Sequence, residues 1–187
     1  MNYLNFLAEL STHVEKLSNL AQSALFWILG EGILTGLDAS EEWWDWIRSA
    51  SQQGFTYATT GLASPDSLSL RIQAGDLAGC EETTQHLQSV VGCFICAIKD
   101  DGSGSGSDAS RAFFPLMQDE SLRLFGDVAQ GDDDDEDEVF SQPRIQQAVG
   151  FVKTIIDVLN RTPTPTAALV RGLQHGSEVL SPAINRS

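Results

Sequence analysis

Seven consecutive acidic side chains form the run DDDDEDE at residues 132–138, the most unusual chemical feature of this sequence. A block of like charges either stays extended in water as a solvated loop or forms a contact strip that attracts a basic partner. The run does not fit an EF-hand calcium loop that starts at Asp132, because its sixth position is Asp137 where the loop needs a glycine. We therefore expect only weak, non-selective attraction of cations.

The cysteines are the other candidates for chemistry. Cys93 and Cys96 have the CxxC spacing, and Cys80 with His86 would supply two further zinc ligands nearby in the sequence. However, the CxxC pair lies inside an apolar helical stretch, whereas structural zinc sites present well-spaced ligand pairs on turns. Free cysteine is among the most buried residue types. We therefore predict that Cys93 and Cys96 pack in the core, and we expect no metal.

Motifs for catalysis are missing from the sequence. It contains no P-loop and no dinucleotide-binding fingerprint, and no nucleophile elbow outside the Gly/Ser-rich stretch at 102–106. The three histidines are far apart and form no metal-binding pair. A triad assembled only in space stays open, because such triads are defined by geometry. We expect a protein without enzymatic activity and without a cofactor.

Charge and composition narrow the class of partner. The formal net charge is −15 in 187 residues, and the acidic excess is spread over residues 1–150. Such a field repels nucleic acid and anionic lipid and attracts basic proteins. The longest apolar run, ALFWIL at 24–29, is far shorter than the ~20 residues of a membrane span. With no basic leader and an odd number of cysteines, we expect a cytoplasmic protein.

The elements that position these residues are predicted to be helices. Apolar residues at steps of three and four from Tyr3 to Ile28 predict one long helix that Gly30, Gly32 and Gly36 end. Asp38 as N-cap predicts a helix closed by Gly54. Further helices are predicted to begin near Pro65, Glu81, Pro115, Pro143 and Ala167.

The predicted fold class is all-α, a single domain over residues 1–187 with about six helices. Three segments are predicted to lie outside the helices. Residues 100–108 read as a Gly/Ser linker, residues 131–138 as an acidic loop before the last long helix, and residues 176–187 as a frayed tail. The sequence shows no internal repeat and indicates no oligomeric state.

Two stretches carry a resemblance to known proteins. AGCEETTQHLQSVVGCFICAI (78–98) and FFPLMQDESLRLF (113–125) resemble an uncharacterised family of small all-helical bacterial proteins. They are also similar, more loosely, to immunity proteins of polymorphic toxin systems. The step from Pro115 to Gln118 is the most specific part, although Phe114 stands where the resemblance calls for a histidine. The resemblance implies a compact helical fold and no catalytic activity.

We therefore hypothesise an acidic binding protein that neutralises a basic protein partner. An immunity protein is the favoured case, with a nuclease as an example of the toxin. The alternatives are a structural or assembly adaptor that holds a partner helix, and an acidic mimic of nucleic acid. The expected contact residues form two patches: Asp132, Asp133, Asp134, Asp135, Glu136, Asp137 and Glu138, and then Glu41, Glu42, Trp44 and Asp45.

Overall fold

The computed structural model describes residues 2–35, 37, 41–78, 85–98, 106–126 and 133–181. All regular secondary structure in these ranges is helical, so the predicted all-α class is confirmed, with more helices than the six expected. In chain order the elements are α1 (Tyr3–Glu15), α2 (Asn19–Leu34), α3 (Glu41–Thr60), α4 (Ser67–Ala78), α5 (Gln85–Ala97), α6 (Gly106–Ala109), the 3₁₀ turn η1 (Ser110–Ala112), α7 (Phe114–Phe125), α8 (Asp133–Phe140), α9 (Pro143–Asn160), α10 (Ala167–Gln174) and the 3₁₀ turn η2 (Ser177–Leu180).

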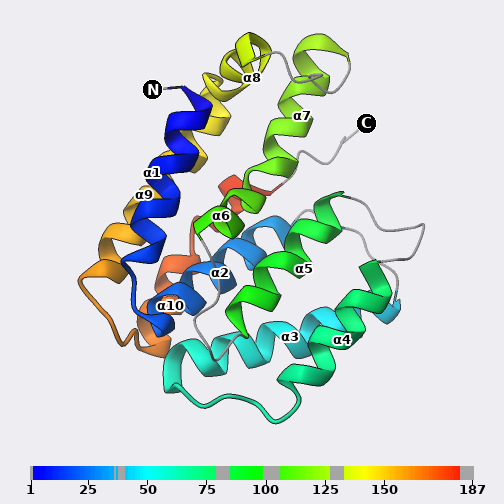
Figure 1. Ribbon diagram of the computed structural model, residues 1–187, viewed down its shortest axis with the longest axis vertical. Helices are drawn as coiled ribbons and strands as arrows, with labels where there is room; N and C mark the ends of the chain where they lie inside the picture. Colours follow the sequence, from blue (N-terminus) through cyan, green and yellow to red (C-terminus); the bar gives the residue numbers. More distant parts are fainter. Residues whose placement is uncertain are drawn as a thin grey trace.

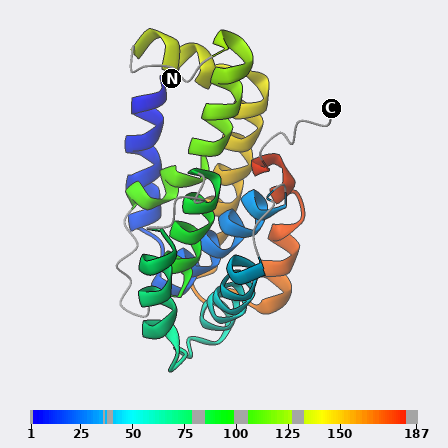
Figure 2. The same ribbon diagram turned by 90° about the vertical axis from the view of Figure 1, so that its right-hand side faces the viewer.

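The helices group toward two ends of the molecule. α1, α7, α8 and α9 extend together to one end, whereas α3 and α4 lie at the other end (Figures 1 and 2). The N-terminus lies beside α8. Among the helices of the described ranges, none combines the length and the apolar character that a bilayer crossing would need.

The apolar stripe of residues 3–28 spans two helices, α1 and α2, instead of the single helix predicted. Ser18 marks the break between them. Its hydroxyl accepts a hydrogen bond from the backbone N–H of Ala21 at 3.2 Å, which caps α2, and donates one to the carbonyl oxygen of Pro163 at 2.5 Å. Most of the stripe is nevertheless buried, as the spacing predicts.

The expectation that Gly30 and Gly32 end this segment is wrong, because α2 continues through both. Each glycine allows another part of the chain to approach the helix closely. A Cβ atom at Gly30 would lie 2.9 Å from Cε1 of Phe94, and one at Gly32 would lie 2.6 Å from the carbonyl oxygen of Ser177. Close packing therefore explains these two glycines better than helix termination does.

Helix α2 forms the centre of the core. Every residue from Ala21 to Gly30 is buried, which is typical of a helix that is surrounded by protein on all sides. α2 packs against α3, α5, α9, α10 and η2 (Figure 1). Elements from both halves of the chain therefore meet on this one helix.

Helix α3 carries three of the tryptophans and also passes through a predicted stop at Gly54. A Cβ atom at Gly54 would lie 2.9 Å from the Cβ of Ala97 on α5, so this glycine too marks a close contact. Trp43 and Trp46 are both buried and pack edge to face with ring centroids 6.2 Å apart. The predicted N-cap of this helix, Asp38, lies outside the described residues.

Cys93 and Cys96 lie on α5 and are both buried in the core. The predicted packing role of the pair is therefore confirmed. Burial raises the pKa of the Cys93 thiol far above its ordinary value, and the neighbouring Cys96 raises it further. Such a thiol stays protonated and is a poor nucleophile. Cys80 lies outside the described residues.

Two of the segments predicted as irregular are partly helical. In the linker 100–108, residues from Gly106 onward form α6, whereas residues 100–105 lie outside the described part of the chain. In the tail, η2 packs onto α2, and Leu180 is completely buried there. The tail prediction is therefore wrong as far as residue 181, because one buried leucine fixes this segment.

Candidate functional site

The acidic run is helical from Asp133 onward, which corrects the prediction of a loop for residues 133–138; residues 131 and 132 lie outside the described part of the chain. α8 begins at Asp133, and every residue from Asp133 to Glu138 is acidic. Acidic residues in the first turn of a helix are generally favourable because they lie near the positive end of its dipole. Val139 and Phe140 at its other end are buried. The ring centroid of Phe140 lies 5.4 Å from that of Tyr3 and 5.2 Å from that of Phe6, so α8 is anchored to α1 by aromatic packing.

The carboxylates of the run have different roles. Asp137 accepts a hydrogen bond at its Oδ1 from the backbone N–H of Tyr3 at 2.8 Å, so it satisfies a free donor at the start of α1. Asp135 and Glu136 are half-buried and Glu138 is exposed. Among the described residues, these three side chains have no hydrogen bond or ion pair. The side chains of residues 132–134 lie outside the described part.

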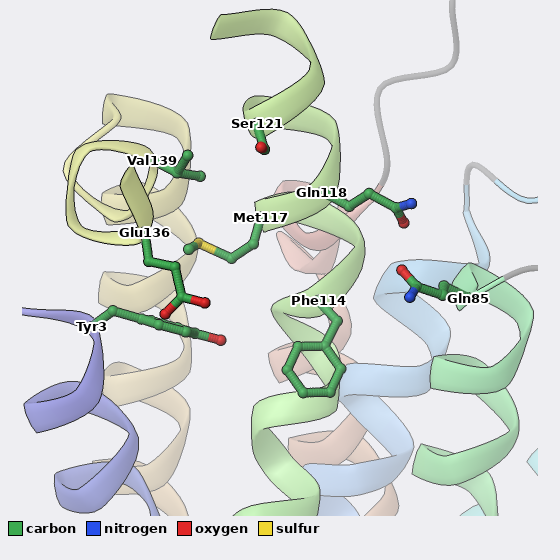
Figure 3. Close-up of a pocket in the computed structure, with 8 residues that line it drawn as sticks. All are labelled: Tyr3, Gln85, Phe114, Met117, Gln118, Ser121, Glu136 and Val139. Atoms are coloured by element: carbon green, nitrogen blue, oxygen red, sulfur yellow. The ribbon is translucent and has the colours of Figure 1, made fainter. Parts of the chain in front are cut away.

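A cavity of about 270 Å³ lies between α8 and α7. Figure 3 shows the Glu136 carboxylate pointing into it next to the hydroxyl of Tyr3, with Met117 extending from α7 on the opposite side. Burial raises the pKa of the Tyr3 hydroxyl to about 12, and the charge of Glu136 adds to the effect. Tyr3 therefore stays neutral and offers a hydroxyl donor. The cavity is lined by Tyr3, Gln85, Phe114, Met117, Gln118, Ser121, Glu136 and Val139.

Helix α7 continues this cavity as an exposed apolar face. Phe114 is 46% exposed, Leu122 is 46% exposed and Phe125 is 43% exposed. At helical spacing, Phe114, Gln118 and Phe125 lie on one face, and Leu122 flanks it. We call the cavity together with this face of α7 the α7–α8 groove. Exposed apolar side chains that lie together beside charged groups are a feature of protein–protein interaction sites.

A buried carboxylate holds α7 in place behind the groove. Glu120 is only 5% exposed and accepts a hydrogen bond at Oε2 from Nε of Arg123 at 2.6 Å. Its Oε1 lies 3.5 Å from Nη1 of Arg144 on α9. Arg144 also donates to the carbonyl oxygen of Ser181 at 2.5 Å. This network joins α7, α9 and the end of η2, so the wall of the groove is firmly supported.

The second predicted patch lies at the start of α3, at the opposite end of the molecule from α8 (Figures 1 and 2). The structure therefore does not bring the two predicted patches together. Asp45 is exposed and forms an ion pair with Arg48 one turn along α3. The side chains of Glu41 and Glu42 lie outside the described part of the chain.

Trp44 is half-buried and lines a separate groove of about 430 Å³ between α2, α3 and α10. Trp44, one of the expected contact residues, therefore lies at a groove, although not at the one beside α8. Glu31 on α2 lines the same groove and accepts hydrogen bonds from Ser51 Oγ at 2.5 Å and from Gln174 Nε2 at 3.3 Å. Burial raises the pKa of the Glu31 carboxyl, an effect that the Ser51 hydrogen bond opposes.

Sequence reasoning identifies the acidic side of the α7–α8 groove and misses its apolar side. Phe114, Met117 and Gln118 lie within the stretch 113–125, which the resemblance singles out, but no feature of the sequence pairs them with α8. The sequence marks Tyr3 only as part of a helix stripe. Leu4, the neighbour of Tyr3, is 56% exposed and lies outside that stripe, so the helical periodicity does not single it out.

Comparisons of the chain with protein families, with curated proteins and with solved structures find no match. The described residues also contain no cluster of three or more side chains suited to hold a metal ion.

Proposed function

We propose that this protein binds a basic protein partner at the α7–α8 groove. One observation carries the proposal: carboxylates without cationic partners in the described structure border an apolar groove with exposed aromatic side chains. Asp135, Glu136 and Glu138 would meet lysine or arginine side chains of the partner. Phe114 and Phe125 would cover apolar side chains that lie between those basic residues.

The charges favour fast and selective encounter. With a net charge of −15, the whole molecule attracts a basic protein, and the carboxylates of α8 direct it to one end. Such steering acts over roughly the Debye length, which is ~8 Å at physiological ionic strength. The same field repels nucleic acid, so a direct nucleic-acid ligand is disfavoured.

The apolar side supplies affinity. Binding energy at interfaces is concentrated in a few buried aromatic or arginine anchors, and the surrounding contacts mainly exclude water. Phe114 stands at the junction of the cavity and the exposed face, so it is the expected anchor on this chain. An amphipathic helix with basic residues along one edge matches both sides of the groove.

The biological role we favour is immunity: the protein would neutralise a basic toxin, for example a nuclease, in the cytoplasm of the cell that makes it. The adaptor that holds a partner helix is the second candidate, since the apolar face of α7 alone suits that role. The two differ in salt dependence. Steered binding to a basic toxin weakens strongly with salt, whereas purely apolar docking is almost insensitive to it.

Two model peptides represent the two kinds of partner helix in a binding test. One is an 18-residue amphipathic helix of leucine and lysine, and the other has glutamate in place of every lysine. We expect the lysine peptide to bind and the glutamate peptide not to bind in fluorescence anisotropy. The variant Asp135→Asn, Glu136→Gln, Glu138→Gln should lower the association rate of the lysine peptide about tenfold at low salt and flatten its salt dependence.

The matched control removes three carboxylates elsewhere, with Glu15→Gln, Asp66→Asn and Asp157→Asn. It has the same net charge as the α8 variant, so its association rate should exceed that of the α8 variant. Equal rates for the two variants would show that only the total charge matters and would remove the α7–α8 groove from the proposal. Where a toxin-like gene lies directly upstream, restored growth on co-expression tests the immunity role.

A further inference from the structure

Arg71 on α4 is a half-buried guanidinium without a partner among the described residues. Its Nε atom is buried and has no hydrogen-bond acceptor there, and the side chain takes part in no ion pair with them. Four other arginines, Arg48, Arg111, Arg123 and Arg144, each contact a carboxylate. Arg161 and Arg171 also form no ion pair with the described residues, but Arg161 is exposed and Arg171 lies over the ring of Phe55, whereas the Nε of Arg71 is buried. A buried donor without an acceptor costs stability, so the Arg71 guanidinium is not fully satisfied by the described residues.

Arg71 lines a cavity of about 560 Å³ between α3, α4, α5 and η1, which we call the Arg71 cavity. Arg111 lines it too, and Gly92 on α5 makes this possible. A Cβ atom at Gly92 would lie 2.9 Å from Cδ of Arg111, so the aliphatic part of Arg111 lies directly against α5. The Nε of Arg111 lies 3.2 Å from Oδ1 of Asp108. The two guanidinium groups and this one carboxylate therefore carry a formal charge of +1 together.

The remaining walls of the cavity are mostly apolar. Val91 and Ile95 on α5 and Ala74 on α4 lie beside the arginines. Gly75, one helical turn after Arg71, has open space where a side chain would begin, with no atom within 4 Å of an ideal Cβ. The cavity is thus open beside the Arg71 guanidinium, and its size is typical of a small-molecule site.

We propose that the Arg71 cavity binds a small organic anion, with a carboxylate or phosphate group on Arg71 and a short apolar group along Val91 and Ile95. A guanidinium presents its N–H groups in a planar fork that matches such oxyanions, and these charge-assisted hydrogen bonds are strong. The inference is independent of the α7–α8 groove, which is lined by other residues.

Calorimetric titration of the full chain with simple probes tests this proposal. Hexanoate and hexyl phosphate combine both features, whereas acetate and inorganic phosphate have only the oxyanion, and hexanamide has only the apolar part. Each methylene that becomes buried should tighten binding about fourfold, so hexanoate should bind at least about tenfold more tightly than acetate. A comparison of hexanoate with hexyl phosphate identifies which oxyanion the cavity prefers.

Two variants of the cavity and one control complete the test. Arg71→Gln should raise the dissociation constant of the preferred probe about tenfold or more, because a charge-assisted hydrogen bond is lost. Gly75→Leu should do the same while both arginines remain, because its side chain would fill the open space. The control, Arg161→Gln, removes an exposed arginine at the end of α9 and should leave binding unchanged.

A nuclear magnetic resonance readout checks the binding mode. The guanidinium signals of Arg71 should shift on addition of the preferred probe, since the guanidinium gains an oxyanion partner. Hexanamide that binds as tightly as hexanoate, or a dissociation constant that is equal in the wild type and in Arg71→Gln, would overturn the proposal. Absence of any binding by both hexyl probes would overturn it as well.

Discussion

Replacement of Phe140 by alanine tests whether the acidic run is held as a helix. Phe140 is 2% exposed, and its ring packs on Tyr3 and Phe6 at centroid distances of 5.4 Å and 5.2 Å. Truncation of a buried phenylalanine to alanine costs about 3–5 kcal/mol of unfolding free energy. For a domain of this size, each kcal/mol lowers the melting temperature by roughly 2–4 °C. We therefore expect a fall of roughly 6–20 °C.

Urea unfolding followed by circular dichroism measures this loss, and two variants serve as references. Phe125→Ala makes the same chemical change at a side chain that is 43% exposed, so its cost should be within about 0.5 kcal/mol. Phe140→Leu keeps most of the buried volume and should cost less than about 1.5 kcal/mol. Phe125→Ala should therefore be the most stable of the three variants, Phe140→Leu intermediate and Phe140→Ala the least stable.

Phe140→Ala also tests whether binding depends on the position of the acidic side chains and not only on their number. Phe140→Ala keeps every carboxylate of residues 132–138 but removes the anchor of α8 on α1. If the proposed binding surface is correct, the association rate of the lysine peptide should fall below that of the wild type at equal net charge. A loss of less than about 1 kcal/mol for Phe140→Ala would refute the reasoning, because a solvated acidic loop without a buried anchor would behave in that way.

Two further predictions concern α2. Gly32→Ala should destabilise the protein by about 1–3 kcal/mol in urea unfolding, because its Cβ atom would lie 2.6 Å from the carbonyl oxygen of Ser177; wild-type stability would contradict the close contact. Burial raises the pKa of Glu31 above its ordinary value of 4.5, so charging this group opposes folding as the pH rises through the pKa of the folded state. Relative to Glu31→Gln, the wild type should therefore gain stability as the pH falls from 7 toward 4, and a difference in melting temperature that stays constant over this range would contradict the assignment.

Local signals predict the helices that begin at a proline or end where a proline follows. Pro143 begins α9 and Ala167 begins α10, as the sequence indicates. Proline and N-capping residues act through their own backbone geometry and their nearest neighbours, so the sequence alone reveals them. The long apolar stripe is also evident from the sequence, but the capping role of Ser18 at its interruption is not.

Glycine gives the wrong signal at three positions for a shared reason. Gly30, Gly32 and Gly54 each lie inside a helix, where a glycine weakens the local preference. Each of them also permits close contact with a segment far away in the sequence, such as Phe94 or Ser177. That benefit depends on the tertiary structure, so the local sequence alone predicts, wrongly, that the helices end at these glycines.

The candidate site likewise has some features that the sequence determines and others that depend on the tertiary structure. The sequence determined the net charge and the position of the acidic run, because charge belongs to each residue wherever the chain places it. Only the tertiary structure decided that Val139 and Phe140 hold the run as a helix, that α7 lies across a cavity from it, and that Arg71 meets no carboxylate among the described residues. These features depend on contacts between residues far apart in the chain, which periodicity and capping signals do not contain.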